Sequence, residues 1–230
     1  MRLPVLLSVP HAGLDIPPEV MSYNLLTEKQ IAEDGDEGAA EIYDLEGMVD
    51  AYVTTRVARA FVDMNRAADD RRKDGVVKTD TCWDVPIYTE PLPESLVERL
   101  LAGYHYPYHL KLEKLSPARQ LCVDCHTMAA VGPPAGPDHG KPRPFICLSN
   151  ARVACPDCLL AKFKEILQVE FGLPVSVNDP FEGGYIIRRH CSVTPWIQVE
   201  FTRDRQISSG RKRDGFLKAL RELVKFINNA

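Results

Sequence analysis

The chain has 230 residues, of which 45% are hydrophobic, and its formal net charge is −4 at pH 7. This length and composition suit one α/β domain with a sizeable core, and we expect a single domain over residues 1–230. A slightly acidic chain has no general attraction to nucleic acid or to membrane surfaces. Neither is therefore expected as a partner.

The N-terminal segment is interpreted as a strand and not as a signal peptide. Its apolar run fills only the space between Pro4 and Pro10, and no small-residue cleavage site follows. No apolar stretch approaches the ~20 residues that a membrane-spanning helix needs. We therefore expect a cytoplasmic protein whose seven cysteines are reduced thiols.

Apolar runs and helical spacing predict the elements of the chain in order. The first half contains a strand (5–9), two helical segments (from Thr27 to 33 and from 39 to 46), two strands (51–55 and 59–63), a surface excursion (67–91) and a long helix (93–115). The second half contains a strand (121–128), a loop (129–144), a strand (145–148), a helix (156–171), two strands (175–177 and 196–201) and a final helix (209–227). Strands that alternate with helices predict an α/β sandwich on a mixed, mainly parallel sheet.

Three local signals refine this pattern. Thr27 and Gln30 have the spacing of a capping box, which starts a helix. Pro107 lies inside the long helical pattern and is expected to kink it, because proline lacks a backbone N–H. The loop 129–144 holds five prolines and three glycines, and it is a candidate lid.

Polar side chains gather where the predicted strands end. Asp124 and His126 lie two residues apart at the end of an apolar strand and therefore share one face of it. The other polar strand ends are His11, the segment 63–66, and the pair Gln198 and Glu200. Because open α/β sheets bind ligands at the carboxyl ends of their strands, a shared cleft is the better explanation for this set.

Two imidazoles and a carboxylate are a typical ligand set for a catalytic zinc ion. His11 and His126 supply the imidazoles, and the acidic cluster at 34–37 is the natural source of the carboxylate. The alternative for this cluster is an acidic cap that the dipole of the following helix favours.

The sequence resembles the N-formylglutamate amidohydrolases, which are related to the zinc carboxypeptidases and share their α/β fold. The matching segments keep the order of that family from residue 8 to 203, and they are 8–13, the helix start at 36–43, 62–66, 106–109, 123–128, 178–186 and 198–203. The resemblance implies a three-layer α/β sandwich around a central mixed sheet. It also implies one bound zinc ion.

The resemblance further implies roles for the metal-site residues. His11 and His126 would bind zinc through their imidazoles, and Asp36 would be the carboxylate ligand. In the zinc carboxypeptidases this carboxylate comes three residues after the first histidine, where this chain has Leu14. Asp34 and Glu37 therefore remain alternatives to Asp36.

The remaining family roles concern catalysis and substrate. Glu200 would be the general base, and Asp124 would orient His126. Asn65 and Arg66 would hold a substrate carboxylate, a task for which a planar guanidinium is well suited.

A dicarboxylate substrate needs a second cation, and the sequence leaves its identity open. The candidates are Arg152, Arg188, Arg189 and Arg203, and Arg203 has the alternative role of a structural ion-pair partner. Tyr185, beside two glycines, is a candidate for closing over the substrate, with a core tyrosine as the alternative. For His109 and His190 we favour structural hydrogen bonds.

The cysteines offer a rival metal site. Cys122 and Cys125 pair with Cys155 and Cys158 in a repeated CxxC spacing that is typical of structural zinc. A strand would place Cys122 and Cys125 on opposite faces, which argues against such a site.

The sequence therefore predicts a zinc-dependent amidohydrolase that cleaves an N-formyl or other N-acyl amide of an acidic amino acid, most simply N-formylglutamate to formate and glutamate. The partner expected is this small molecule, and the protein is expected to be a monomer or a small homo-oligomer. The alternatives are a carboxypeptidase or cell-wall peptide amidase with the same zinc chemistry, and a non-catalytic binding protein. The acyl group and the physiological metal stay open.

Overall fold

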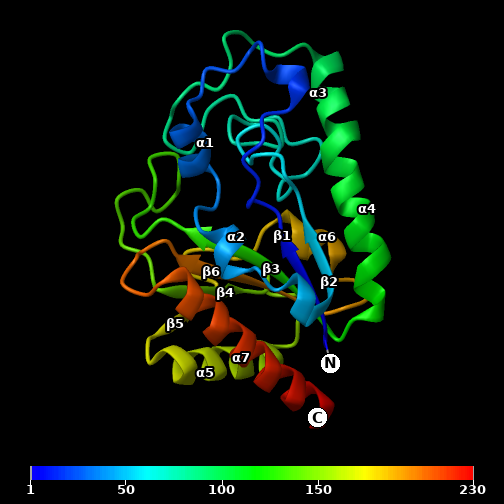
Figure 1. Ribbon diagram of the computed structural model, residues 1–230, viewed down its shortest axis with the longest axis vertical. Helices are drawn as coiled ribbons and strands as arrows, with labels where there is room; N and C mark the ends of the chain where they lie inside the picture. Colours follow the sequence, from blue (N-terminus) through cyan, green and yellow to red (C-terminus); the bar gives the residue numbers. More distant parts are fainter. Residues whose placement is uncertain (1, 230) are drawn as a thin grey trace.

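Six strands form the central sheet of the computed structural model, which describes residues 2–229 (Figure 1). In sheet order they are β2 (Val49–Thr54), β1 (Leu3–Val9), β3 (Leu121–Met128), β6 (Trp196–Thr202), β4 (Ile146–Ser149) and β5 (Val175–Val177). β2, β1, β3 and β6 are parallel to one another, while β4 is antiparallel to β6 and parallel to β5. The predicted mixed, mainly parallel sheet is confirmed.

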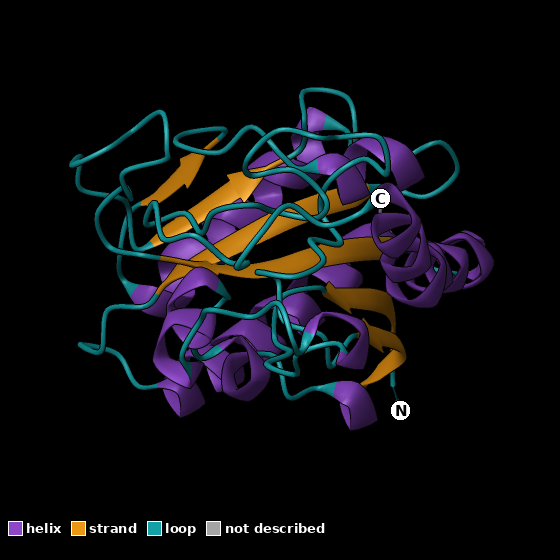
Figure 2. Cartoon of the chain, turned by 90° about the horizontal axis from the view of Figure 1, so that it is seen from above, coloured by secondary structure: helices purple, strands orange, loops and turns teal. Residues whose placement is uncertain are grey.

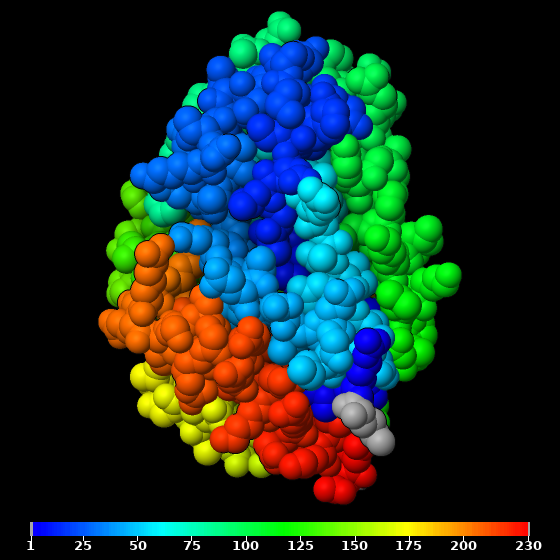
Figure 3. All heavy atoms as spheres, viewed as in Figure 1, coloured from blue at the N-terminus to red at the C-terminus, as the bar shows by residue number. Residues whose placement is uncertain are grey.

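Helices cover both faces of the sheet and complete a three-layer sandwich (Figure 2). They are α1 (Glu28–Asp34), α2 (Ala39–Ile42), α3 (Glu94–Leu100), α4 (Tyr106–Leu115), α5 (Asp157–Phe171), α6 (Tyr185–His190) and α7 (Ser209–Asn229). α2, α5 and α7 pack on one face, and α3, α4 and α6 pack on the other. The space-filling view shows the orange-to-red C-terminal helix beside the blue N-terminal part of the chain (Figure 3).

Alternation along the strands builds these two cores. Val123 and Cys125 of β3 join the core under α5 and α7, whereas Cys122 joins the core under α3 and α4. The two cysteines therefore lie on opposite faces, as predicted. Cys158 is exposed, and the part of the chain that the structure describes holds no four-cysteine cluster.

The helix starting after Thr27 is confirmed together with its capping box. The next helix is shorter than predicted, because α2 ends at Ile42 and a 3-10 turn (Glu46–Met48) follows.

The predicted strand at 59–63 is wrong. This segment forms turns in which the N–H groups of Phe61 and Val62 both donate to the carbonyl of Ala58. Its apolar side chains are buried, so the apolar run reflects burial and not sheet pairing.

The long helix at 93–115 is also interrupted. A π-helical stretch (Leu101–His105) joins α3 to α4, and Pro107 lies just after it in the first turn of α4. The irregularity therefore precedes Pro107. A proline in the first turn of a helix destabilises it little, because the N–H group that proline lacks has no partner within the helix there. Within residues 2–229, no helix is long and apolar enough to cross a bilayer.

Candidate metal centre

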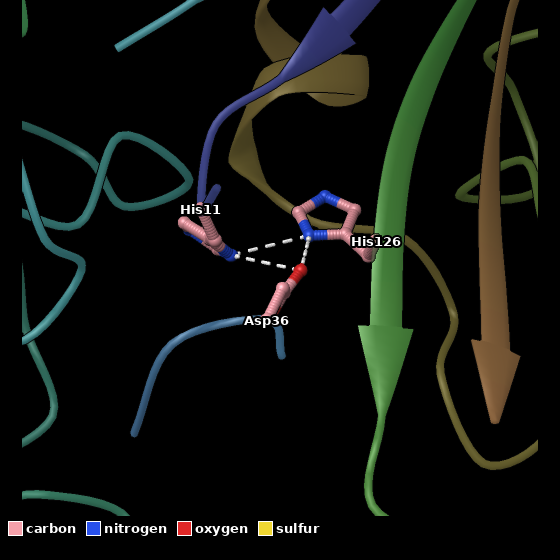
Figure 4. Close-up of side chains that lie close together, drawn as sticks. All are labelled: His11, Asp36 and His126. Atoms are coloured by element: carbon pink, nitrogen blue, oxygen red, sulfur yellow. Dashed lines mark hydrogen bonds and ion pairs between the residues drawn. The ribbon is translucent and has the colours of Figure 1, made fainter. Parts of the chain in front are cut away.

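Three side chains from distant parts of the chain converge at the carboxyl ends of β1 and β3 (Figure 4). His11 follows β1, His126 lies near the end of β3, and Asp36 comes from the turn between α1 and α2. His126 Nδ1 lies 3.2 Å from His11 Nδ1 and 3.0 Å from Asp36 Oδ2, which is 3.5 Å from His11 Nδ1. All three residues are buried.

Each imidazole also contacts a second carboxylate through its Nε2 atom, on the side of the ring opposite to Nδ1. His11 Nε2 lies 2.8 Å from Asp63 Oδ1, and His126 Nε2 lies 2.8 Å from Asp124 Oδ2. An ionised carboxylate only accepts hydrogen bonds, so these contacts place a proton on each Nε2. In the neutral rings both Nδ1 lone pairs then face Asp36 Oδ2.

This donor set fits a divalent metal ion. Two lone pairs and a carboxylate oxygen this close repel one another unless a positive charge lies among them. Two imidazoles and one carboxylate leave a further coordination position open, as in catalytic zinc sites. The carboxylates behind His11 and His126 complete the arrangement that usually orients metal-bound histidines.

The neighbouring carboxylates favour positive charge at this point, carried by a metal ion or, in its absence, by a proton on His126. Burial lowers the pKa of His126, but Asp124, Glu200 and Asp36 together raise it well above the usual value. Burial raises the pKa of Asp36, yet His11 and His126 hold it well below its usual range. The cluster therefore favours an ionised Asp36 beside positive charge.

Of the three acidic residues at 34–37, only Asp36 faces the imidazoles. Its Oδ2 also accepts a hydrogen bond from the backbone N–H of Thr127 at 3.1 Å. Asp34 turns away to the buried ammonium of Lys78 at 2.9 Å, and Glu37 pairs with the exposed Arg205.

Glu200 lies beside His126, because the two residues are register partners on β6 and β3. Burial raises the pKa of Glu200 to about 7, although His126 lowers it. Gln198, two residues earlier on the same face, donates a hydrogen bond from Nε2 to Oε1 of Glu200 at 2.9 Å. A buried carboxylate with this pKa suits proton transfer near neutral pH.

A cavity of about 320 Å³ contains the three converging residues and Glu200. Four guanidinium groups also line it, from Arg59, Arg66, Arg143 and Arg203. Arg203 bonds backbone carbonyls of residues 33, 35 and 127, so its role in the structure is largely to hold these loops together. Each of the four guanidinium groups already pairs with a carboxylate of the chain, so an anionic ligand would have to share or displace one of these ion pairs.

The predicted substrate residues divide into two groups. Arg66 lines the cavity and is held by Asp74 at 3.4 Å. Asn65 lines it too, but its amide is engaged with Asp124 and with the N–H of Ile186.

The structure does not bring the other three predicted substrate residues to the cavity. Arg152 and Arg189 are exposed and pair with Glu182 and Glu113. Tyr185 lies at the start of α6, where its ring stacks on His105 and not against the cavity. The short surface ion pairs explain where the two arginines point.

Sequence reasoning assigned no role to Asp63 or Gln198, although both were noted at strand ends. It also missed Lys78 and Arg59, which line the cavity. The signals for Asp63 were its position at a predicted strand end and its place two residues before Asn65 in a family motif. Its contact with His11 joins residues 52 positions apart, which spacing does not reveal.

Comparison with known proteins decides the family. A family model described as N-formylglutamate amidohydrolase matches residues 3–206. The chain belongs to the N-formylglutamate amidohydrolase family. The N-formylglutamate deformylase of Pseudomonas aeruginosa is 29% identical over 203 residues, which cover 82% of this chain and 75% of that protein. The N-formylglutamate deformylase of Pseudomonas putida is 27% identical over 203 residues, with the same coverage.

Solved structures share the fold of this family member. N-formylglutamate amidohydrolase from Ralstonia eutropha JMP134 superposes with a TM-score of 0.74 at 20% identity, covering 99% of this chain and 92% of that chain. An Agrobacterium tumefaciens gene product gives a TM-score of 0.76 at 20% identity, covering 98% and 90%. The resemblance and the fold class are therefore confirmed, and family membership indicates a hydrolase of amide bonds.

Proposed function

We propose that the protein is a zinc-dependent amidohydrolase that converts N-formylglutamate and water to formate and glutamate. The observation that carries this proposal is the convergence of His11 Nδ1, His126 Nδ1 and Asp36 Oδ2 in the cavity that also contains Glu200. The deformylases of the two Pseudomonas species support the choice of substrate.

His11, Asp36 and His126 are the residues that would hold the metal. When bound there, zinc supplies a Lewis acid that polarises the amide carbonyl and makes water more acidic. Glu200 accepts the proton of the water that adds to the formyl carbon. It then delivers that proton to the amide nitrogen as the carbon–nitrogen bond breaks.

Arg66 is our candidate for binding a substrate carboxylate. Its guanidinium lines the cavity and is held by Asp74, whose side chain is 45% exposed, so a ligand carboxylate is able to compete for the same donors. We assign Asn65 to holding Asp124, because its side-chain amide already donates to Asp124 Oδ2.

The shape of the cavity favours a small substrate over a peptide. The loop 129–144 forms a wall of the cavity and is tied to the opposite side, since Ala135 N–H donates to Cys82 O at 3.3 Å. Arg143 in this loop lies over the ring of Phe181, 4.8 Å from its centroid. A cell-wall peptide amidase would need a longer groove than these contacts leave.

Metal analysis of the purified protein, combined with hydrolysis of a panel of N-acyl amino acids, tests the proposal. We expect one zinc per chain and the highest kcat/KM with N-formylglutamate. His126→Ala should lose the metal, whereas His139→Ala, which removes an exposed histidine, should keep it. Full metal content in His126→Ala, or preference for a peptide, would contradict the proposal, and binding without turnover would favour a non-catalytic protein.

A further inference from the structure

Three histidines lie behind the proposed metal centre, against the segment 63–66. His109 Nε2 is 2.9 Å from the carbonyl of Met64, and His105 Nε2 is 2.9 Å from the carbonyl of Arg66. His109 Nδ1 is 2.8 Å from His190 Nε2, and the planes of these two rings are nearly parallel, at an angle of 13°. All three rings are buried and come from the π-helical stretch, α4 and α6.

The chemistry of these contacts fixes where the ring protons lie. A backbone carbonyl only accepts a hydrogen bond, so His109 donates from Nε2 to Met64. The neutral ring then carries a lone pair on Nδ1, which accepts from Nε2–H of His190. Burial lowers the pKa of His109 to about 3 and that of His190 to about 4, which keeps both rings neutral at physiological pH.

The segment that these histidines hold also orients both candidate metal-binding imidazoles. Asp63 Oδ1 contacts His11 Nε2, and it accepts the backbone N–H of Asn65 at 2.8 Å. The side-chain amide of Asn65 lies 3.4 Å from Asp124 Oδ2 and 3.2 Å from His126 Nε2. Within this segment the side chains of Asp63 and Asn65 therefore point towards the metal centre. The backbone carbonyls of Met64 and Arg66 point towards His109 and His105.

We propose that His109 is a positioning residue for the metal centre, acting through the Met64 carbonyl on Asp63 and Asn65. His190 fixes the ring of His109, and His105 holds the other end of the segment at Arg66. The inference rests on the proposed function for the role of zinc, but the orientation of His11 and His126 is a property of the chain itself.

The variants follow from the two hydrogen bonds of His109. His109→Phe keeps a planar ring of similar volume and removes both bonds. His109→Gln keeps an amide N–H for the Met64 carbonyl and an oxygen for His190 Nε2–H. His139→Phe is the matched control, because His139 is exposed and lies outside the cluster.

Nitrogen-15 NMR of the histidine rings in the metal-free protein is the first measurement. We expect His109 as the Nε2–H tautomer, and we expect His109→Phe to shift the ring signals of both His11 and His126. His109→Gln should restore those signals towards the wild type, and His139→Phe should leave them unchanged. Unmoved signals of His11 and His126 in His109→Phe would overturn the proposal, whether or not the protein binds zinc.

Zinc affinity, measured by competition with a chelator, is the second measurement. We expect His109→Phe to weaken zinc binding about tenfold, the lower end of what the loss of an outer partner causes, with His109→Gln in between. Equal affinity in wild type and His109→Phe would overturn the positioning role and leave the proposed function standing. If His109→Phe fails to fold, His190→Phe removes only the outer hydrogen bond, and the same ring signals and affinity decide.

Discussion

Gln198 donates a hydrogen bond to Glu200 across one face of β6, with 2.9 Å between Nε2 and Oε1. The other end of the same amide accepts the backbone N–H of Gly184 at 2.7 Å. One side chain therefore fixes the proposed general base to the loop that borders the cavity.

Removing this hydrogen bond should change the pH dependence of catalysis. Burial raises the pKa of Glu200 to about 7, and the bond from Gln198 lowers it because it favours the ionised form. In Gln198→Leu the pKa should rise, so the acid side of the kcat/KM profile should move to higher pH. Gln206→Leu removes an exposed amide and serves as the control. If the acid side of the kcat/KM profile stays at the same pH in Gln198→Leu, Gln198 does not control the pKa of Glu200.

Replacing Glu200, the proposed base, should separate catalysis from metal binding. Glu200→Gln keeps the shape of the side chain but accepts no proton, so we expect kcat to fall about 10²–10⁴-fold while zinc content stays unchanged. Turnover and metal content are measured on the same preparation, with the exposed Glu98→Gln as control. Unchanged turnover would remove Glu200 from the role of base.

The carboxylate behind His11 should matter for metal affinity. Asp63→Ala removes the acceptor that fixes the His11 ring, and we expect zinc binding to weaken about 10–100-fold. It also removes the nearer of the two carboxylates that pair with Arg59, at 3.0 Å in the wild type, and leaves Asp36 at 3.9 Å. Chelator competition measures the effect, and Asp50→Asn, an exposed acid, should bind zinc as the wild type does. Wild-type affinity in Asp63→Ala would contradict this orienting role.

The buried ion pair of Lys78 and Asp34 should be important for stability. Lys78→Met leaves Asp34 buried without its cation, and we expect the free energy of unfolding to fall by about 3–5 kcal/mol. Adding Asp34→Asn should recover much of the loss. Lys73→Met removes an ammonium that is 75% exposed and pairs with Asp80, and it should change stability by less than about 1 kcal/mol. Urea unfolding measures all four proteins.

The acid dependence of that loss follows from the lowered pKa of Asp34. Burial raises this pKa, but Lys78 and Arg59 outweigh the effect of burial and leave the pKa of Asp34 below the ordinary value for an aspartate. A lowered carboxyl pKa contributes stability above the unfolded-state value, and the contribution disappears as pH falls through the folded-state value. The difference in the free energy of unfolding between wild type and Lys78→Met should therefore be largest at neutral pH and become smaller in acid. A pH-independent difference would exclude the ionic explanation.

Sequence patterns located the strands that matter for the site, because β3 and β6 are largely apolar segments buried on both faces, interrupted by the polar residues of the site. The run at 59–63 is also apolar at its centre, yet the N–H groups of Phe61 and Val62 bond within a turn. Hydrophobicity reports burial in both cases and does not distinguish the backbone partner.

Only those contacts of the site that join residues close in the sequence could be predicted. Asp124 and His126 share a strand face, so their hydrogen bond follows from spacing. The contact of Asp63 with His11 depends on how two loops meet. The positions of Arg152 and Arg189 depend on Glu182 and Glu113, which offer nearer partners than the cavity.

The order of the strands also constrains how the molecule comes together during synthesis. β3 lies between β1, which is made first, and β6, which emerges from the ribosome almost two hundred residues later. His11 and Asp36 are therefore translated long before the strand that carries Glu200. Such non-local parallel pairing folds slowly and leaves strand edges open in the nascent chain. We expect the candidate metal centre to acquire Glu200 late, after β6 has been synthesised, and the unfinished sheet to expose an unpaired edge of β3 until then.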